Sequence, residues 1–480
     1  MATSPVRALL ITSNGAGMGH LSRMLAVAVA AGGSADPTML SLSVAFPVVA
    51  GHGLNGEYCP SAERRFMPDH LWHRYLRRRI VALAGEVDAQ VIAFDGVAPY
   101  PGLVAARGDL GEVPMVWIRR GMWRPGANDH QLAGSPVFDL IIEPGDLAAA
   151  GDRGPTAARS DAILVPPITQ VDIIVRPDRV TAAAELGIDP DRPTALVTLG
   201  TGRVGEVAGP GAVAVSALLE DRRWQVCVTR PAVAERAVPL VDPERVIELR
   251  GVYPLARYLG AFDAVVSSAG YNAVHEFIPV GLPTLLIPNT ATRTDDQTAR
   301  AEWLGGVGLA LTARPDEAEA ITAAVRILSI DEVRANLAAA CAALPEDRRS
   351  GGAAAAAGLV MGLRAGARPP VALVARMARS RSAGRQAVKR MIGPTATERV
   401  RVLLGRPQTG GIPHRLQVAI VDTPRAASAD GVRDLLFSES IPADQIAAGP
   451  VVEHLLPGSS LRYRAERLRI IEDTYRVVST

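Results

Sequence analysis

Two strand–turn–helix units of the same build constrain the fold of this 480-residue chain most strongly. The first predicts a strand at Val6 to Ser13, a glycine-rich turn, and a helix from His20 to Ala30 whose apolar residues recur at helical spacing. The second predicts a strand at Ala195 to Leu199 and a turn at Gly200-Thr201-Gly202. Further short apolar runs follow each unit. We therefore predict an α/β protein in which two Rossmann-like, doubly wound domains face a cleft.

A proline-rich stretch divides the two predicted domains, and the composition changes again near residue 364. The predicted parts are an N-terminal domain (1–168), a linker (169–193), a second Rossmann-like domain (194–363), a basic segment (364–410) and a small appended α/β module (411–480). Within the last part the sequence predicts a strand at Leu416 to Val421 and a helix at Leu461 to Tyr475.

Residues 263–297 carry the clearest functional pattern. An apolar strand runs through the small residues 267–270 into a predicted helix, and the free N–H groups at a helix start favour an anion such as a diphosphate. Glu276 lies about two helical turns further on, where its carboxylate can accept both hydrogen bonds of a ribose diol. Asp296 and Gln297 offer acceptors and a donor suited to sugar hydroxyls. The pattern indicates a nucleotide-sugar site.

On these residues the sequence resembles the donor-binding half of inverting GT-B glycosyltransferases. The resemblance is above all to the family 28 group, which contains the peptidoglycan lipid-linked N-acetylglucosaminyl transferase. The spacing from Gly270 to Glu276 agrees with that group, and Gly281-Leu282-Pro283 is in register. A fuller resemblance, to actinobacterial UDP-N-acetylglucosamine transferase-like proteins, runs from Asn14 to about residue 365.

The resemblance implies roles for particular residues. Glu276 would hold the ribose of a UDP-sugar, the turn at 268–270 would face the diphosphate, and Asp296-Gln297 would touch the sugar. Thr201 matches a turn that offers a hydroxyl to phosphate, and Val252 falls where uracil is recognised through backbone atoms. The complete predicted donor set is Gly17, Gly19, Gly200, Thr201, Val252, Ser268, Ala269, Gly270, Glu276, Asp296 and Gln297.

His20 and Asp95 are the predicted catalytic residues. His20 matches a G-x-G-H turn whose histidine faces the cleft in the family, and imidazole has the near-neutral pKa that a general base needs. The alternative is a helix-start histidine that bonds backbone or donor phosphate. Asp95 ends a predicted strand, where it would orient His20, act as the base alone, or merely be a turn residue before Gly96.

Arg119 and Arg120 follow another predicted strand that opens on the cleft. Their guanidinium groups are suited to an acceptor that carries phosphate, so we predict that they bind the acceptor. Ordinary salt bridges are the alternative, because arginine is common throughout this chain.

Several other chemistries are disfavoured. His20 stands where the third glycine of a dinucleotide fingerprint belongs, which argues against NAD binding. Thr284 stands where retaining GT-B enzymes carry a second glutamate, which favours inversion. Asp189-Pro190-Asp191, the best candidate for a metal-binding D-x-D, is interpreted as a turn. We therefore expect neither a metal nor a cofactor beyond the UDP-sugar co-substrate.

The charge distribution is uneven. Residues 364–406 contain eleven Arg or Lys and one Glu, a net charge near +10, whereas the whole chain carries +2 and the remainder therefore about −8. We expect this segment to attract anionic lipid head groups rather than nucleic acid, and a basic helical face packed on the acidic domains is the alternative. Three widely spaced cysteines, no recognisable signal peptide and no run of 18 apolar residues predict a cytoplasmic protein, peripheral on the membrane.

Together these patterns predict an inverting, metal-independent transferase. It would move a sugar, N-acetylglucosamine above all, from a UDP-sugar to a hydroxyl of a cell-envelope glycan or polyprenol-linked acceptor. Two alternatives remain open from the sequence: a UDP-sugar 2-epimerase of the same fold, and a non-catalytic nucleotide-sugar-binding partner.

Overall fold

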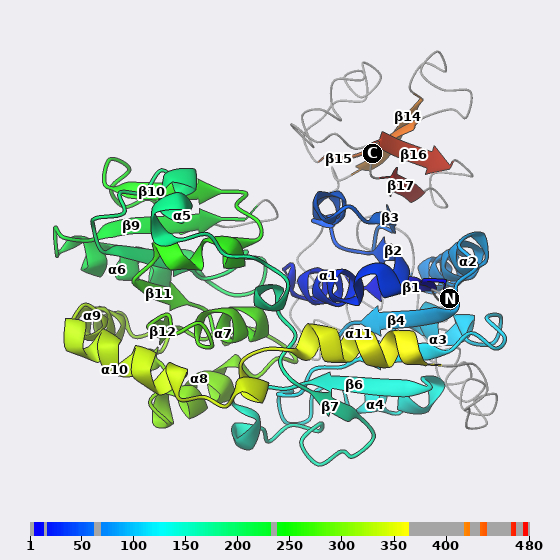
Figure 1. Ribbon diagram of the computed structural model, residues 1–480, viewed down its shortest axis with the longest axis horizontal. Coiled ribbons are helices and arrows are strands. Elements are labelled where there is room, and N and C mark those ends of the chain that lie inside the picture. Colours follow the sequence, from blue (N-terminus) through cyan, green and yellow to red (C-terminus); the bar gives the residue numbers. More distant parts are fainter. Residues whose placement is uncertain are drawn as a thin grey trace, which may run out of the picture.

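The computed structural model describes residues 4–13, 17–61, 69–231 and 238–363, together with the backbone of four strands at 417–422, 433–438, 462–466 and 474–478. Figure 1 shows two lobes, each a sheet covered by helices on both faces.

The first lobe is built on a sheet in the strand order β3-β2-β1-β4-β5-β6-β7, all parallel. The strands are β1 (Val6–Thr12), β2 (Ala35–Ser41), β3 (Asn55–Tyr58), β4 (Val91–Asp95), β5 (Met115–Ile118), β6 (Leu140–Pro144) and β7 (Ile163–Val165). Its helices are α1 (Gly19–Ala31), α2 (Asp69–Glu86), α3 (Pro101–Ala106) and α4 (Asp129–Leu132). The order of the first six strands is that of the doubly wound dinucleotide-binding fold.

Successive residues of β1 enter two different cores. Ala8 and Leu10 pack with α1 in one hydrophobic core, and Leu9 and Ile11 pack with α2 and α3 in the other. A strand that is buried on both faces must be apolar throughout, because its side chains alternate between the faces. This explains why the run Ala8 to Ile11 has no polar residue.

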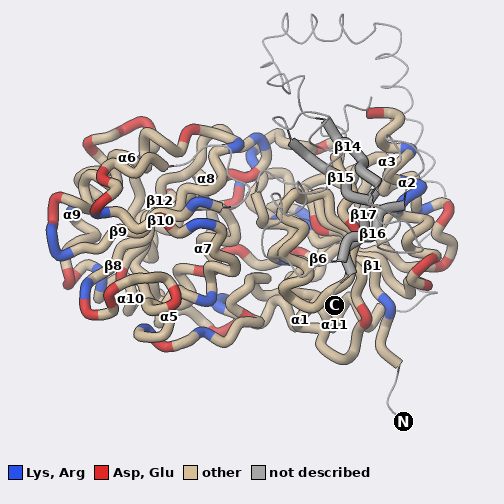
Figure 2. Tube along the Cα trace, turned by 90° about the horizontal axis from the view of Figure 1, so that it is seen from above, with Lys and Arg blue, Asp and Glu red and all other residues tan. Residues whose placement is uncertain are grey.

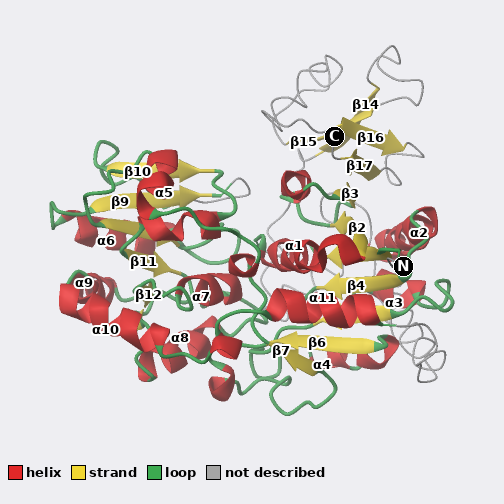
Figure 3. Ribbon diagram, viewed as in Figure 1, coloured by secondary structure: helices red, strands yellow, loops and turns green. Residues whose placement is uncertain are grey.

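The second lobe repeats the plan in the order β10-β9-β8-β11-β12-β13, again all parallel. The strands are β8 (Thr194–Thr198), β9 (Gln225–Arg230), β10 (Val246–Arg250), β11 (Ala264–Ser267), β12 (Thr284–Leu286) and β13 (Leu311–Thr312). The helices are α5 (Arg179–Leu186), α6 (Ala208–Leu219), α7 (Tyr271–Phe277), α8 (Gln297–Gly306), α9 (Ala318–Leu328) and α10 (Asp331–Ala342), with a 3₁₀ helix at Leu255–Ala261. Figure 3 shows that helices cover both faces of this sheet and that loops fill the space between the lobes.

The lobes exchange elements at both ends, which changes two predicted boundaries. Helix α5 lies inside the predicted linker 169–193, yet it packs on the 3₁₀ helix of the second lobe through Ala182 and Ala183. Helix α11 (Gly352–Gly362) lies inside the predicted second domain, yet its Ala356 and Val360 are buried in the core of the first lobe beside α1. The second domain therefore begins before residue 194 and ends before α11, because apolar packing and not chain order assigns each helix to a core.

Near the C-terminus the structure describes strands only: β14 (Gln417–Asp422), β15 (Arg433–Ser438), β16 (Arg462–Glu466) and β17 (Thr474–Val478). β17 pairs antiparallel with β3 and extends the sheet of the first lobe, while β14 and β15 form a separate two-stranded sheet. The helix predicted from Leu461 to Tyr475 is wrong for residues 462–466, whose alternating polar pattern Arg-Tyr-Arg-Ala-Glu suits a strand. The basic segment 364–410 lies outside the described residues.

Candidate active site

The two sheets direct the carboxyl ends of their central strands toward one region. In each lobe the strand order reverses between two neighbours, β1 and β4 in the first and β8 and β11 in the second, and ligands of open α/β sheets bind beside such points. Gly17, which precedes α1, faces the turn that follows β8: a Cβ placed on Gly17 would lie 3.7 Å from Thr201 Cγ2. A Cβ on Gly19 would lie 3.7 Å from Asn272 Oδ1 of α7. Predicted residues from both lobes therefore meet across the boundary.

His20 and Asp95 form a hydrogen-bonded pair. His20 stands in the first turn of α1 and Asp95 ends β4, and His20 Nδ1 lies 2.6 Å from Asp95 Oδ1. Asp95 is fully buried, whereas His20 keeps 8% of its surface exposed, so a solute can reach the pair only through the imidazole. Of the arrangements left open by the sequence, the geometry matches the one in which Asp95 orients His20.

Arg23 completes this pair, and the sequence analysis missed it. Its Nε and Nη2 donate to the two oxygens of Asp95 at 2.9 and 2.6 Å, and Nη2 also lies 2.8 Å from His20 Nδ1. A carboxylate only accepts and an arginine only donates, so Asp95 accepts from Nδ1–H in the tautomer that leaves Nε2 as a proton acceptor, and Nη2 donates to Nδ1 only in the other tautomer. The i, i+3 spacing from His20 to Arg23 on one helix face was the available signal.

Burial and charge favour neutral imidazole beside an ionised carboxylate. Burial lowers the pKa of His20 below its usual value, and the Arg23 and Arg120 charges act in the same direction against the opposing effect of Asp95. Burial opposes ionisation of Asp95, but Arg23 and His20 together hold its pKa below the usual range. A neutral histidine with a free Nε2 is the form in which a general base works.

Glu276 lies near the end of α7, half-buried. Burial raises the pKa of its carboxyl to about 7, and the one opposing contact is a hydrogen bond from the Gln170 backbone. Burial raises the pKa of Tyr253 and the Glu276 charge adds to this effect; the Tyr253 hydroxyl is 3.2 Å from Ser22 Oγ of the first lobe. Within the described residues no cation compensates this carboxylate. This is typical of a binding group whose hydrogen-bond donors come from a ligand.

The small-residue turn predicted to face a diphosphate joins β11 to α7. Ser268 N–H donates to Thr198 O of β8 at 3.3 Å, and Gly270 precedes the helix with no side-chain cap. Gly200, which begins the neighbouring turn, has φ +96°, a conformation that L side chains rarely adopt. The two turns that were predicted to contact phosphate are thus adjacent. Val252 is half-buried beside the 3₁₀ helix of the same lobe.

Asp296 and Gln297 are committed to the local structure. Asp296 caps α8 by accepting from Ala299 N–H at 3.1 Å. Gln297 Oε1 accepts from Asn289 N–H at 3.0 Å, and Asn289 Nδ2 in turn donates to Val204 O of the loop after β8. A Cβ on Gly270 would lie 3.7 Å from Gln297 Nε2, so the amide nitrogen borders the predicted diphosphate turn.

The two arginines that were predicted to bind the acceptor have different surroundings. Arg119 is fully buried and pairs with Asp161 and Glu143 at 2.8 and 3.2 Å, so the salt-bridge alternative is correct for it. Arg120 crosses to the second lobe, where its Nη1 lies 3.1 Å from Asp295. Burial lowers the pKa of Arg120, with Arg23 and Arg300 acting in the same direction. Both residues follow the end of β5 (Met115–Ile118), and only Arg120 reaches the boundary.

Buried ion pairs, also missed by the sequence analysis, join the lobes beside this site. Arg300 of α8 is fully buried and contacts Asp146 of the first lobe and Asp295 of its own lobe, each at 3.0 Å. His275 of α7 accepts from Leu147 N–H at 2.9 Å through Nε2, and burial lowers its pKa to about 4, so it stays neutral. Figure 2 shows charged segments of both signs where α7 and α8 face the first lobe.

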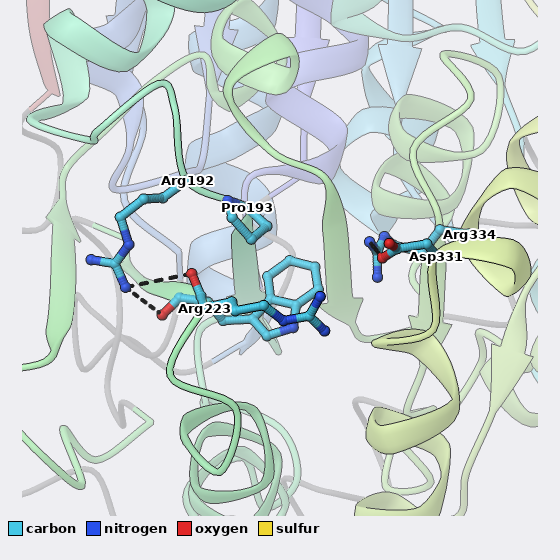
Figure 4. A pocket seen from close by; sticks show the side chains of 6 residues that line it. Arg192, Pro193, Arg223, Asp331 and Arg334 are labelled. Atoms are coloured by element: carbon cyan, nitrogen blue, oxygen red, sulfur yellow. Dashed lines mark hydrogen bonds and ion pairs between the residues drawn. The ribbon is translucent and has the colours of Figure 1, made fainter.

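A surface pocket of about 440 Å³ lies elsewhere, at the amino end of β8 (Figure 4). Its arginines already have partners: Arg192 donates to backbone carbonyls, Arg223 pairs with Asp221, and Arg334 lies over the Trp224 ring beside Asp331. This pocket is therefore not the predicted site.

Among the described residues, no group of three or more His, Cys, Asp or Glu is arranged to hold a metal ion. No helix there is both long and apolar enough to span a bilayer.

Known proteins resemble both the sequence and the fold. No protein-family model matches the chain. It is 30% identical over 220 residues to the UDP-N-acetylglucosamine--N-acetylmuramyl-(pentapeptide) pyrophosphoryl-undecaprenol N-acetylglucosamine transferase of Leifsonia xyli subsp. xyli. It is 31% identical over 212 residues to the protein of the same name from Clavibacter sepedonicus. Each match covers 44% of this chain, and the matches span 56% and 53% of those relatives, a little over half of their length.

Solved structures agree on the fold over a longer stretch. MurG of Acinetobacter baumannii superposes with a TM-score of 0.50 at 14% identity, and the spinosyn rhamnosyltransferase SpnG complexed with thymidine diphosphate with 0.50 at 17%. Each covers 74% of this chain and 100% of the solved one. The protein therefore has the GT-B fold, and its sequence resembles the family 28 glycosyltransferases.

Proposed function

We propose that the protein is an inverting, metal-independent glycosyltransferase that uses a UDP-sugar. The observation that carries the proposal is the His20–Asp95 pair at the switch point of one lobe, which Arg23 joins to α7, the helix of the other lobe that follows the small-residue turn and carries Glu276. The named relatives transfer N-acetylglucosamine from UDP-N-acetylglucosamine to a lipid-linked acceptor, which supports that donor and a lipid-linked or glycan acceptor here.

The reaction assigns each group one task. His20 Nε2 accepts the proton of the acceptor hydroxyl, whose oxygen attacks the anomeric carbon from the face opposite the UDP. The bond from that carbon to the diphosphate oxygen breaks as the new one forms, so UDP leaves with the electron pair and the configuration inverts. Asp95 stabilises the resulting imidazolium, and backbone N–H groups of the two turns would stabilise the departing diphosphate.

A donor screen tests the proposal. The protein is incubated with single UDP-sugars, with and without a membrane extract, and UDP release is measured. We expect release from UDP-N-acetylglucosamine that depends on the extract. Epimerisation or hydrolysis without the extract would instead identify a 2-epimerase. UDP binding without turnover, with the biological role intact in His20→Ala and Asp95→Ala variants, would identify a non-catalytic partner.

We propose further that the protein works in the cytoplasm on the inner membrane surface. The support is the near +10 charge of residues 364–406. Attraction to anionic lipid is screened by salt, so the protein should co-sediment with anionic vesicles at low salt and detach at high salt. Equal binding to neutral and anionic vesicles, or to neither, would reject membrane docking and favour the alternative that the segment packs on the acidic domains.

A further inference from the structure

Arg23 is in contact with three elements at once. The residue is 1% exposed, and its guanidinium makes a two-pronged contact with Asp95 at the end of β4. The third nitrogen, Nη1, donates to Asn272 Oδ1 of α7 at 3.1 Å, and the guanidinium carbon lies 5.2 Å from the centre of the Tyr271 ring. One side chain of the first lobe thus contacts both the His20–Asp95 pair and α7, the helix that carries the predicted donor residue Glu276.

The contact to α7 is reinforced from the other side. Asn272 Nδ2 donates to Gly19 O at 3.4 Å, so this amide bridges the first turn of α1 and the Arg23 guanidinium. Because the guanidinium is planar and its N–H groups form a rigid fork, moving Nη1 away from α7 would also rotate the pair of N–H groups that hold Asp95. The position of α7 and the orientation of the Asp95 carboxylate are therefore mechanically linked.

We propose that Arg23 is a positioning residue that couples the docking of α7 to the alignment of the His20–Asp95 pair. When α7 is docked, Asn272 fixes the guanidinium, the guanidinium fixes Asp95, and Asp95 fixes the tautomer and ring orientation of His20. When α7 moves away, the pair loses this support, so the base is fully ordered only while the donor lobe is in place. This inference rests on the proposed function, since it assigns His20 as the base.

Arg23 also has an electrostatic effect that separates its role from a purely structural one. The charged groups that face His20 are Asp95 from β4, Arg23 from α1 and Arg120 after β5. Arg23 lowers the pKa of His20, so replacing it by a neutral side chain should raise that pKa. A loss of packing elsewhere would not move the titration of this one imidazole.

The test uses Arg23→Met, Arg23→Lys and Asn272→Ala, with Arg326→Met, which removes an exposed arginine paired with Glu220, as the matched control. We expect Arg23→Met to lower kcat about 10- to 100-fold, the range that a misplaced catalytic group produces. The acid limb of its pH profile should move to higher pH, and UDP affinity should stay within about twofold. Arg23→Lys keeps the charge but not the fork, so kcat should fall while the acid limb stays. Wild-type kinetics in both Arg23 variants would overturn the proposal.

A second measurement needs no turnover. Histidine ring signals are titrated by NMR in protein with labelled histidine, with His20→Gln to assign the His20 signal. We expect the His20 pKa to rise in Arg23→Met and to remain unchanged in Asn272→Ala. Added UDP should shift the His20 signal in the wild type and much less in Asn272→Ala. An unchanged titration in a folded Arg23→Met, or an equal UDP response in Asn272→Ala, would overturn the coupling. If the wild type transfers no sugar yet shows these shifts, the proposed function fails and the coupling stands.

Discussion

Glu276 carries the most unusual charge state of the predicted donor residues. Its pKa of about 7 arises from burial without a compensating cation among the described residues. A carboxylate in that position gains from any ligand that supplies hydrogen-bond donors, as a ribose diol does. The residue is thus less stable than it would be in solution until a ligand arrives, which is typical of a binding group rather than a packing group.

Binding of uridine should therefore depend on pH. The free carboxyl has a pKa of about 7, and the hydroxyl donors favour its ionised form and lower that pKa in the complex. Affinity should be highest above pH 7 and should fall as the pH drops below 7. Calorimetry with uridine is the measurement, because UDP has a phosphate that itself titrates near pH 6. Glu276→Gln should bind about tenfold more weakly at pH 8, with little pH dependence. Unchanged affinity in the folded variant would reject the ribose assignment.

The same substitution should raise stability above pH 7. A carboxyl whose pKa is raised by folding contributes most below its unfolded value of 4.5, and that contribution is lost as the pH rises through 7. Replacing it by a neutral amide removes a cost of up to about 3 kcal/mol at pH 8 and changes little at pH 4. Urea unfolding of the two proteins at both pH values measures the difference. Equal stability gains at pH 4 and pH 8 would contradict the raised pKa.

The His20→Ala variant should show whether His20 acts as the general base or as a ligand contact. If His20 is the base, turnover falls by about 10²-fold or more while UDP affinity is nearly retained. Steady-state kinetics and calorimetry on one preparation decide it. Retained turnover together with lost UDP binding would make His20 a phosphate contact and assign the base to Asp95.

At the scale of elements, the chain passes from the first lobe to the second near residue 172 and returns to the first lobe at α11. The start of α11 depends on contacts from the first of these two segments. Asp172, in the 3₁₀ helix Gln170–Asp172 between the lobes, accepts from Gly351 N–H and Ala353 N–H at 3.1 and 3.0 Å. A Cβ on Gly352 would approach Pro166 O and Pro167 O to 2.1 and 2.3 Å, a distance that only glycine permits. The two segments that connect the lobes are therefore held together by a helix cap and a close backbone contact.

Asp172→Ala should destabilise the protein by about 1 kcal/mol, the usual cost of losing a side-chain cap. Asp172→Asn should cost less, because the amide oxygen still accepts. Asp178→Ala is the matched control: it removes the same kind of cap from α5, where Asp178 accepts from Thr181 N–H at 2.8 Å within a single lobe. Urea unfolding measures all three. Proteolysis within the two segments that connect the lobes should increase for Asp172→Ala and not for Asp178→Ala. The reverse result would contradict the role of Asp172 in holding these segments together.

For the whole molecule, the relative position of the lobes depends on charges that are buried or largely buried at the boundary. Arg300 faces Asp146 across the boundary, and the pair Arg120–Asp295 crosses in the opposite direction. The positive and negative charges balance in number, and opposite charges lower the pKa of Asp295 to about 2. Such pairs are costly to break, since the remaining partner stays buried without compensation.

Arg300→Met should therefore cost about 3 to 5 kcal/mol, the range measured for removing one partner of a buried ion pair. The double variant Arg300→Met with Asp146→Asn should recover part of the loss, because it leaves one buried carboxylate fewer. Urea unfolding gives both values, with Arg326→Met as the exposed control, for which the change should be below about 1 kcal/mol. A loss as small as the control's would mean that the lobes dock without this network.

The sequence by itself determined the two Rossmann-like lobes, their central strands and the turns at 200–202 and 268–270. Those features depend on local rules: apolar runs such as Ala8 to Ile11 form buried strands, and small residues between a strand and a helix form a ligand-facing turn. Asp95 was predicted because it ends a central strand, and His20 because it stands at the start of a helix and matches the G-x-G-H turn of the family. Only the tertiary structure decided which groups meet. It separated Arg119 from Arg120, assigned α11 to the first lobe, and brought Arg23 to Asn272 across the boundary. These outcomes depend on contacts between residues far apart in the chain, and no local pattern encodes the orientation of one lobe against the other.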